Sequence, residues 1–283
     1  MTGSINRVDY KSKQNMDFEI VSLQRFFNTR SHQMISKDYR LNFWTIIYIT
    51  KGSGIHYVDF KGYDYKAGDV IFVQKNQVHH YEISDAKGYI INVNEPFFYK
   101  VSGLNEDIFL EFLDRAFGLP IMSVSDDGIH DVLLELINKE YLALEPNIEL
   151  IAALFQSFIV SIRGALKEGR KILLSKDYEN FKVYRQLVEA HYTTLKSVED
   201  YASLMHLSRR TINQATRKVV DLSAKQFIIE RIILEIKRYL SQGELLNYEI
   251  ADILGFDEVA NMTNFFKRYV GISPKAFRDN IFS

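Results

Sequence analysis

The chain has no cysteine among its 283 residues, which excludes a disulfide scaffold, a thiolate zinc site and a cysteine nucleophile. Four prolines and 14 glycines are too few for a collagen-like or low-complexity chain. Residues 1–20 are polar and lack the apolar core of a signal peptide. The longest apolar run, 148–162, is interrupted by Glu149 and Gln156 and is shorter than the ~20 residues of a membrane span. We therefore expect a cytoplasmic protein without a membrane partner.

Charge of one sign is also lacking. The net charge is −1, and residues 175–283 hold 16 Lys+Arg against 14 Asp+Glu. A nucleic-acid partner would therefore have to be recognised by the placement of charges and not by their sum. The hydrophobic content of 47% is that of a globular protein, and the length favours two domains of about 100–150 residues each.

The first third of the chain has the pattern of short β-strands. Runs rich in β-branched and aromatic residues alternate with glycine or polar turns, and they occupy 41–50, 55–60, 63–66, 70–74, 78–83 and 89–93. Such closely spaced strands predict a small antiparallel barrel or sandwich.

From about Asn105 the hydrophobic spacing becomes helical. One stripe comprises Ile108, Phe112, Leu113 and Ala116, and a second helix is expected over 130–144. A third, more apolar helix over 148–166 carries the stripe Ile148, Ile151, Ala152, Phe155, Ile159, Ile162 and Leu166. A charged segment, 164–177, is expected to lead into a second, wholly helical domain that begins at Tyr178.

The helical domain contains an internal repeat. Residues 198–227 match 247–277 at a shift of 49, which becomes 50 after a one-residue insertion. The matched pairs include Ala202 with Ala251, Ile212 with Met262, and Phe227 with Phe277. Each copy predicts a short helix, a tight turn at 206–207 or 254–255, and an amphipathic helix, which is the helix-turn-helix pattern. A connecting helix over 224–241 would be about 27 Å long, which suits two recognition helices about one DNA turn (~34 Å) apart.

The second copy, IADILGFDEVANMTNFFKRYVGISPKAFR over 250–278, resembles the signature of the AraC/XylS family of transcription regulators. The segment GSGIHYVDF, with the later YKAGDVIFV and NQVH, is similar to that family's cupin-like sensor barrel. Thr216 and Met262 stand where the family has core phenylalanine, and Asp221 replaces the turn glycine. Asp is one of the few residues that tolerate a left-handed conformation there.

The resemblance implies an α+β multidomain fold, with an N-terminal cupin-like β-barrel followed by helices and a C-terminal all-α domain with two helix-turn-helix motifs. We predict a sensing barrel over 1–104, a helical dimerisation segment over 105–168, a linker over 169–177 and a DNA-binding domain over 178–283. The implied function is that of a ligand-responsive regulator that binds double-stranded promoter DNA.

Polar side chains on the two expected recognition helices predict DNA contacts. Arg, Asn and Gln pair with base edges in the major groove, whereas cations near helix ends suit phosphates. The expected contacts on the first helix are Arg209, Arg210, Asn213, Gln214, Arg217 and Lys218, and those on the second are Asn261, Thr263, Asn264, Lys267 and Arg268. Because the second helix opens with Asp257 and Glu258, we expect the first to contribute more electrostatic affinity.

A metal site in the barrel is disfavoured, because Val58 stands where the second histidine of an H-x-H motif belongs and His79 and His80 point to opposite strand faces. No catalytic residue, metal or cofactor is predicted. A small-molecule effector, a sugar or another metabolite, could bind Trp44, Tyr48, His56, Tyr65, His79 and Tyr81. Aromatic residues of this kind also form ordinary barrel cores.

A homodimer is expected to form through the apolar face of 148–166. The residues assigned to that interface are Ile151, Phe155, Phe158, Ile159 and Ile162, and the alternative is that they cover the barrel. Two other functions stay open, a DNA-binding protein whose barrel only dimerises and a metal-dependent cupin enzyme.

Overall fold

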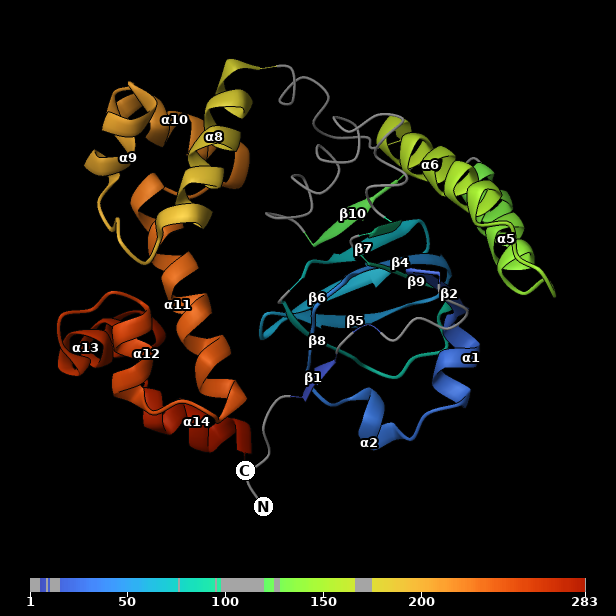
Figure 1. Cartoon of the computed structure of the whole chain (residues 1–283), viewed down its shortest axis with the longest axis horizontal. Coiled ribbons are helices and arrows are strands. Elements are labelled where there is room, and N and C mark those ends of the chain that lie inside the picture. The colour runs from blue at the N-terminus through green and yellow to red at the C-terminus, as the bar shows by residue number, and fades with distance from the viewer. Residues whose placement is uncertain are drawn as a thin grey trace. The chain divides into compact units, whose positions relative to one another are not determined.

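The computed structural model describes residues 6–8, 10, 16–75, 77–94, 96–97, 120–124, 128–165 and 175–282. These residues divide into two compact units, one before and one after residue 169 (Figure 1). The expected helix over 108–116 and Leu166 lie outside the described residues. None of the described helices is long and apolar enough to cross a membrane.

The first unit contains two five-stranded sheets. One has the order β1-β3-β8-β5-β6 and the other β10-β7-β4-β9-β2. The strands are β1 Asn6–Val8, β2 Phe18–Ser22, β3 Tyr39–Leu41, β4 Trp44–Lys51, β5 Ser53–Val58, β6 Lys61–Lys66, β7 Asp69–Val73, β8 Val78–Tyr81, β9 Lys87–Val93 and β10 Ile121–Ser123. All pairings are antiparallel except β1 with β3. The predicted antiparallel β architecture is present.

The central strand β4 alternates between two buried faces. Ile46 and Tyr48 pack on one side against helices, whereas Ile47 and Ile49 belong to the cluster that includes side chains of the other sheet. On the neighbouring strand β9, Gly88 adopts φ +155°, and a Cβ there would lie 2.0 Å from the carbonyl oxygen of Tyr48. Glycine therefore permits the close approach of the two strands.

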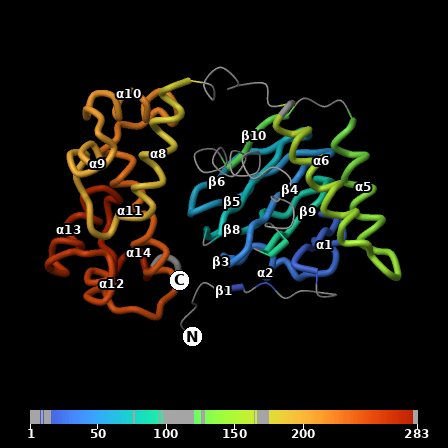
Figure 2. The backbone as a smooth tube through the Cα atoms, turned by 45° about the horizontal axis from the view of Figure 1, so that its top comes forward, coloured from blue at the N-terminus to red at the C-terminus, as the bar shows by residue number. Residues whose placement is uncertain are grey.

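The helices described in this unit are α1 Leu23–Asn28, α2 His32–Ile35, α5 Ile129–Tyr141 and α6 Ile148–Ala165. The last two pack side by side against the sheet that contains β4 (Figure 2). The expected helices over 130–144 and 148–166 are thus confirmed to within a few residues. Their apolar sides and the outer face of that sheet form one core.

The position of α6 corrects the predicted dimer interface. The five residues assigned to it are at most 1% exposed within a single chain: Ile151, Phe155, Phe158, Ile159 and Ile162. Phe155 lies 5.6 Å from Phe18 of β2, and Phe158 lies 6.0 Å from Tyr48 of β4, measured between ring centroids. The prediction was wrong because the apolar face of α6 covers the sheet, so these side chains cannot meet a second chain.

In the second unit, the regular secondary structure of the described residues 175–282 is helical, with α8 Lys176–His191, α9 Val198–Met205, α10 Arg209–Val220, α11 Ala224–Gln242, α12 Asn247–Ile253, α13 Val259–Val270 and α14 Pro274–Phe282. Ser175 caps α8 by accepting a hydrogen bond from the Tyr178 N–H at 3.2 Å, so the helix begins inside the expected linker. Helix α11 joins the group α8–α10 to the group α12–α14 (Figure 1). Its 19 residues span about 28 Å, close to the expected length.

Candidate DNA-binding site

The two copies of the repeat have the same backbone turn. His206 and Gly255 are equivalent positions, and both are left-handed, with φ of 51° and 65°. The next N–H in each copy donates to the carbonyl of the buried alanine, Leu207 to Ala202 at 3.1 Å and Phe256 to Ala251 at 2.9 Å. The two predicted helix-turn-helix units are α9–α10 and α12–α13.

The ends of the second helices also match. Asp221 after α10 and Gly271 after α13 are left-handed, and each donates its N–H to the carbonyl four residues earlier at 3.0 Å. Asp221 thus adopts the conformation that its place in the repeat predicted. Ser223 and Ser273 then cap α11 and α14 with their hydroxyl oxygens.

The inner faces of the two helices differ in size. Met262 and Phe266 of α13 are fully buried. In α10, Ile212 and Thr216 occupy the equivalent positions, and the Thr216 hydroxyl donates to the Ile212 carbonyl at 2.8 Å. Thr216 therefore stays in the core because its hydroxyl is satisfied within the helix.

Opposite the buried face, three exposed positions at helical spacing define an outer stripe on each helix. In α10 the outer stripe consists of Arg210, Gln214 and Arg217. The equivalent residues of α13 are Ala260, Asn264 and Lys267, also exposed. Arg and Gln side chains can pair bidentately with guanine and adenine in the major groove. The first stripe carries two positive charges and the second carries one.

Two other predicted contacts of α10 are held by carboxylates. Arg209 forms an ion pair with Glu199 of α9 at 2.9 Å, with both side chains 64% exposed. Lys218 forms an ion pair with Asp177 in the first turn of α8. The Arg209 pair is exposed on both sides and is therefore weak, so a phosphate can replace its carboxylate. In the second pair the Lys218 side chain is 58% exposed, whereas Asp177 is 17% exposed.

Asn213 differs from the expectation of a base contact. Its side-chain oxygen accepts a hydrogen bond from the Ala224 N–H at 2.9 Å, and its amide donates to the Arg209 carbonyl at 3.1 Å. The side chain thus ties α10 to the start of α11. The structure thus gives Asn213 a role in the fold, and its contact with DNA stays a prediction.

On α13, the predicted contacts Asn261, Asn264, Lys267 and Arg268 are exposed and Thr263 is half-buried. The start of the helix is acidic, with Asp257 and Glu258 exposed beside a hollow of about 520 Å³ that Glu249 and Asp252 also line. These carboxylates repel phosphates, in line with the smaller electrostatic contribution expected of this unit.

In the first unit, four of the six predicted effector residues share the inner side of the barrel. His56 and Tyr81 are directly paired across β5 and β8, and Tyr65 belongs to the same core cluster as Tyr81. The His79 Nδ1 lies 3.2 Å from the His56 Nε2. His80 points to the other side, where it stacks on Tyr57 at 4.3 Å, as the alternation of strand residues predicted.

The other two predicted effector residues face away from this inner side. Tyr48 is buried under α6, and Trp44 packs against the same core, with the Lys75 ammonium 4.0 Å from its ring centroid. Their assignment is corrected because both faces of β4 are buried, and helices cover the face that bears these two residues.

Burial governs the ionisation of the inner residues. It lowers the pKa of His79 to about 3, and it also lowers the pKa of His56, with His79 and His80 adding repulsion. Burial raises the pKa of Tyr81 above its ordinary value. Both imidazoles are therefore neutral at pH 7. Among the described residues, no group of three or more His, Cys, Asp or Glu side chains could hold a metal ion.

Two family models match the chain, one for each unit. Residues 29–159 match the AraC-like ligand binding domain, and residues 201–280 match a helix-turn-helix domain.

Relatives of known name are transcription regulators. The Msm operon regulatory protein of Streptococcus mutans is 30% identical over 134 residues, which are 47% of this chain and 45% of that protein. The transcriptional activator RhaS of Pectobacterium carotovorum is 23% identical over 270 residues, 90% of this chain and 91% of that protein. Among solved structures, ToxT from Vibrio cholerae is similar with a TM-score of 0.47 and 13% identity, covering 94% of this chain and 98% of that one. With both domain models matched in order, the chain belongs to the AraC family of transcription regulators.

Proposed function

We propose that this chain is a ligand-responsive regulator that binds specific promoter DNA with the outer stripes of α10 and α13. The duplicated helix-turn-helix geometry, with polar side chains exposed opposite a buried face, carries the proposal. Arg210, Gln214 and Arg217 would read bases, whereas Lys218, Lys267 and Arg268 would contact phosphates. Asn264 is the candidate reader on α13.

Selection of sites from a random duplex pool by the full-length chain tests this function. The expected result is enrichment of a two-part sequence, one part for each recognition helix. Binding that is equally strong to all duplexes would contradict sequence-specific recognition.

We infer that the effector site lies on the inner side of the barrel, lined by His56, Tyr65, His79 and Tyr81. Aromatic rings and neutral imidazoles, which can donate and accept hydrogen bonds, suit a sugar or a similar polar metabolite. A panel of sugars and metabolites in a thermal-shift assay is expected to include one that raises the melting temperature. If none does, the alternative of a barrel that only dimerises is favoured.

We also propose a homodimer, now through the outward faces of α5 and α6. Apolar side chains that are 42–51% exposed lie there: Ile129, Val132, Leu136, Leu150 and Val160. The double variant Val132→Glu, Val160→Glu should sediment as a folded monomer because each charge would be buried without a partner in the interface. A folded variant that is still dimeric would rule out this face.

A further inference from the structure

The loop 192–197, which joins α8 to α9, is anchored to more than its own helices. The Tyr201 hydroxyl of α9 donates to the Leu195 carbonyl at 2.8 Å. The Tyr192 ring carries the Arg231 guanidinium of α11, 4.0 Å from the ring centroid. The loop is therefore held by both α9 and the connecting helix α11.

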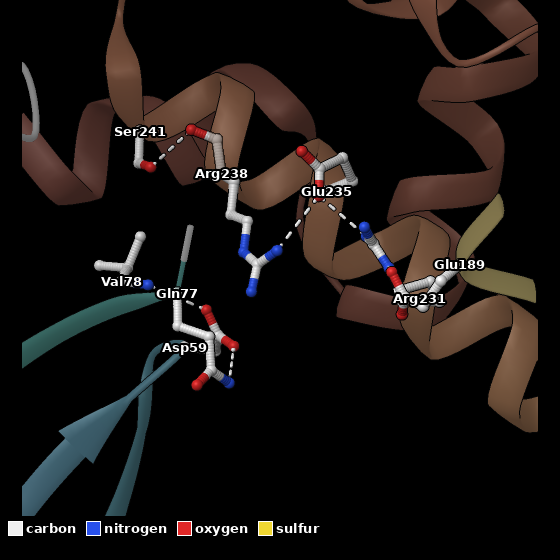
Figure 3. Close-up of polar contacts among 8 residues, drawn as sticks. All are labelled: Asp59, Gln77, Val78, Glu189, Arg231, Glu235, Arg238 and Ser241. Atoms are coloured by element: carbon white, nitrogen blue, oxygen red, sulfur yellow. Dashed lines mark hydrogen bonds and ion pairs between the residues drawn. The ribbon is translucent and has the colours of Figure 1, made fainter. Parts of the chain in front are cut away.

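Arg231 is itself held by two carboxylates. Its Nε donates to both oxygens of Glu189 on α8 at 2.9 Å, and its Nη1 donates to Glu235 at 2.8 Å (Figure 3). Burial by itself would lower the pKa of Arg231, but the two carboxylates raise it above its ordinary value. Because the guanidinium is 10% exposed, loss of a partner would leave a buried charge. Helices α8 and α11 thus have a fixed relation.

The same loop reaches the turn of the second helix-turn-helix unit. The Lys196 ammonium donates to the Gly255 carbonyl and lies 4.0 Å from the centroid of the Phe256 ring. A Cβ at Gly255 would lie 2.1 Å from the Thr193 carbonyl oxygen. The backbone of this turn therefore rests directly on the loop. We call these contacts of Lys196 and Thr193 with Gly255 and Phe256 the inter-unit clamp.

A second attachment changes what the connecting helix can do. One 19-residue helix fixes the distance between two units but leaves bending and twisting about its end. The contact of Lys196 with Gly255, which lies 59 residues later in the sequence in the turn before α13, restrains both bending and twisting. Each DNA base pair rotates the groove by about 34°, so two readers with a fixed relation fit one spacing of their sites best.

We propose that the inter-unit clamp determines spacing specificity, because it fixes the distance and rotation between α10 and α13. Lys196 is then a positioning residue, because it contacts the turn of the second helix-turn-helix unit and not the bases. The inference rests on the proposed DNA-binding function.

The first test measures the relation of the units without DNA. Since the chain has no cysteine, Ser203→Cys and Asp252→Cys place two spin labels at exposed, equivalent positions of α9 and α12. Double electron–electron resonance should give a narrow distance distribution, broadened by Lys196→Ala and restored by Lys196→Arg, which can still donate and stack. Lys225→Ala, which removes an exposed lysine of α11, is the matched control. Equal widths for Lys196→Ala and its parent would overturn the clamp.

The second test measures spacing on DNA. Sites selected by the full-length chain are remade with one base pair inserted or deleted between their two parts. Relative to the original spacing, the parent should lose at least about tenfold in affinity for the altered duplexes. Lys196→Ala should lose only about threefold, because without the clamp α10 and α13 can adjust to the altered spacing. If Lys196→Ala instead weakens binding to the duplexes of original and altered spacing by the same factor, the contact only stabilises the fold and the proposal is overturned. If the parent selects no sequence, the DNA-binding function fails and the spacing role fails with it, whereas the distance measurement still reports the clamp.

Discussion

The two helix-turn-helix units have the same backbone conformation but differ in almost every side chain that faces outward. The first has arginines at 210 and 217, whereas the second has alanine and lysine at the equivalent positions 260 and 267. Their turns hold the same left-handed conformation with histidine in one unit and glycine in the other. The same motif thus has two roles. The unit α9–α10 concentrates positive charge that can face DNA, whereas the unit α12–α13 is anchored to the loop 192–197.

What the two copies retain explains why the motif survives this divergence. The buried alanine of the first helix, the left-handed turn residue and the capping serine all act through the backbone. Those contacts specify the helix crossing whatever the outer side chains are. The residues of the outer stripes can differ between the copies because they are exposed and do not pack in the core.

The largest difference is expected in the cores. Phe266→Ala should lower the free energy of unfolding by about 3–5 kcal/mol because it leaves a cavity, whereas Thr216→Ala at the equivalent position should cost about 1–2 kcal/mol. Urea unfolding followed by far-UV circular dichroism measures both. The fluorescence of Trp44, the single tryptophan, reports the other domain and serves as the internal control. Equal losses in the two variants would contradict the expected difference in core packing between the two helix-turn-helix units.

The turns should respond next. Gly255→Ala is expected to cost at least about 2 kcal/mol, since alanine is strained at φ +65° and its Cβ would collide with the Thr193 carbonyl. His206→Gly, at the matching exposed position, should change stability by less than about 1 kcal/mol. Thermal unfolding of both variants decides. A Gly255→Ala protein as stable as its parent would mean that the turn is not held against the loop.

DNA affinity should separate the units by their charge. Arg210→Ala should weaken specific binding by about 1–3 kcal/mol, and Asn264→Ala by less, because both side chains can pair bidentately with a base but only the arginine also carries a positive charge. Titration of the selected duplex and of a random duplex, at two salt concentrations, gives both losses. If Arg210→Ala weakens both duplexes equally, Arg210 is a phosphate contact and not a base reader.

The smallest effect is expected at the acidic start of α13. The double variant Asp257→Asn, Glu258→Gln should bind DNA about two- to fivefold more tightly, because repulsion of phosphates is lost. Its helix should lose less than about 1 kcal/mol of stability for want of the favourable dipole interaction. An unchanged affinity, measured in the same titration, would place these carboxylates away from the DNA.

The buried His79 of the barrel should make the stability of that domain depend on pH. The pKa of His79 is near 3 in the folded chain and about 6.5 when unfolded, so the unfolded state binds more protons between these values. The contribution of neutral His79 to the free energy of unfolding is therefore fully present above about pH 6.5 and is lost on acidification, by about 3 kcal/mol at pH 4. Unfolding followed by Trp44 fluorescence should show this loss, and His79→Gln should reduce it. A loss that is as large in His79→Gln would assign the effect to other groups.

Periodicity in the sequence predicted most of the strands and helices but not which way they face. The run over 41–50 is correctly a strand, yet Trp44 and Tyr48 lie under helices, because period 2 separates two faces without saying which one lines the barrel. For α6 the apolar stripe was correctly found, and its partner was wrongly taken to be a second chain. Strand β2, Phe18–Ser22, was missed because its polar surroundings hid a short buried segment.

The candidate site shows the same division. The repeat, its turns and the exposed arginines are local patterns, so the residue order determined them, and the family resemblance followed from them. Only the tertiary structure decided that Asn213 serves the backbone of α11, that α6 covers a sheet and that Lys196 meets a turn 59 residues away. Helical and strand periods arise from neighbouring residues, whereas such contacts depend on where the whole chain brings distant segments together.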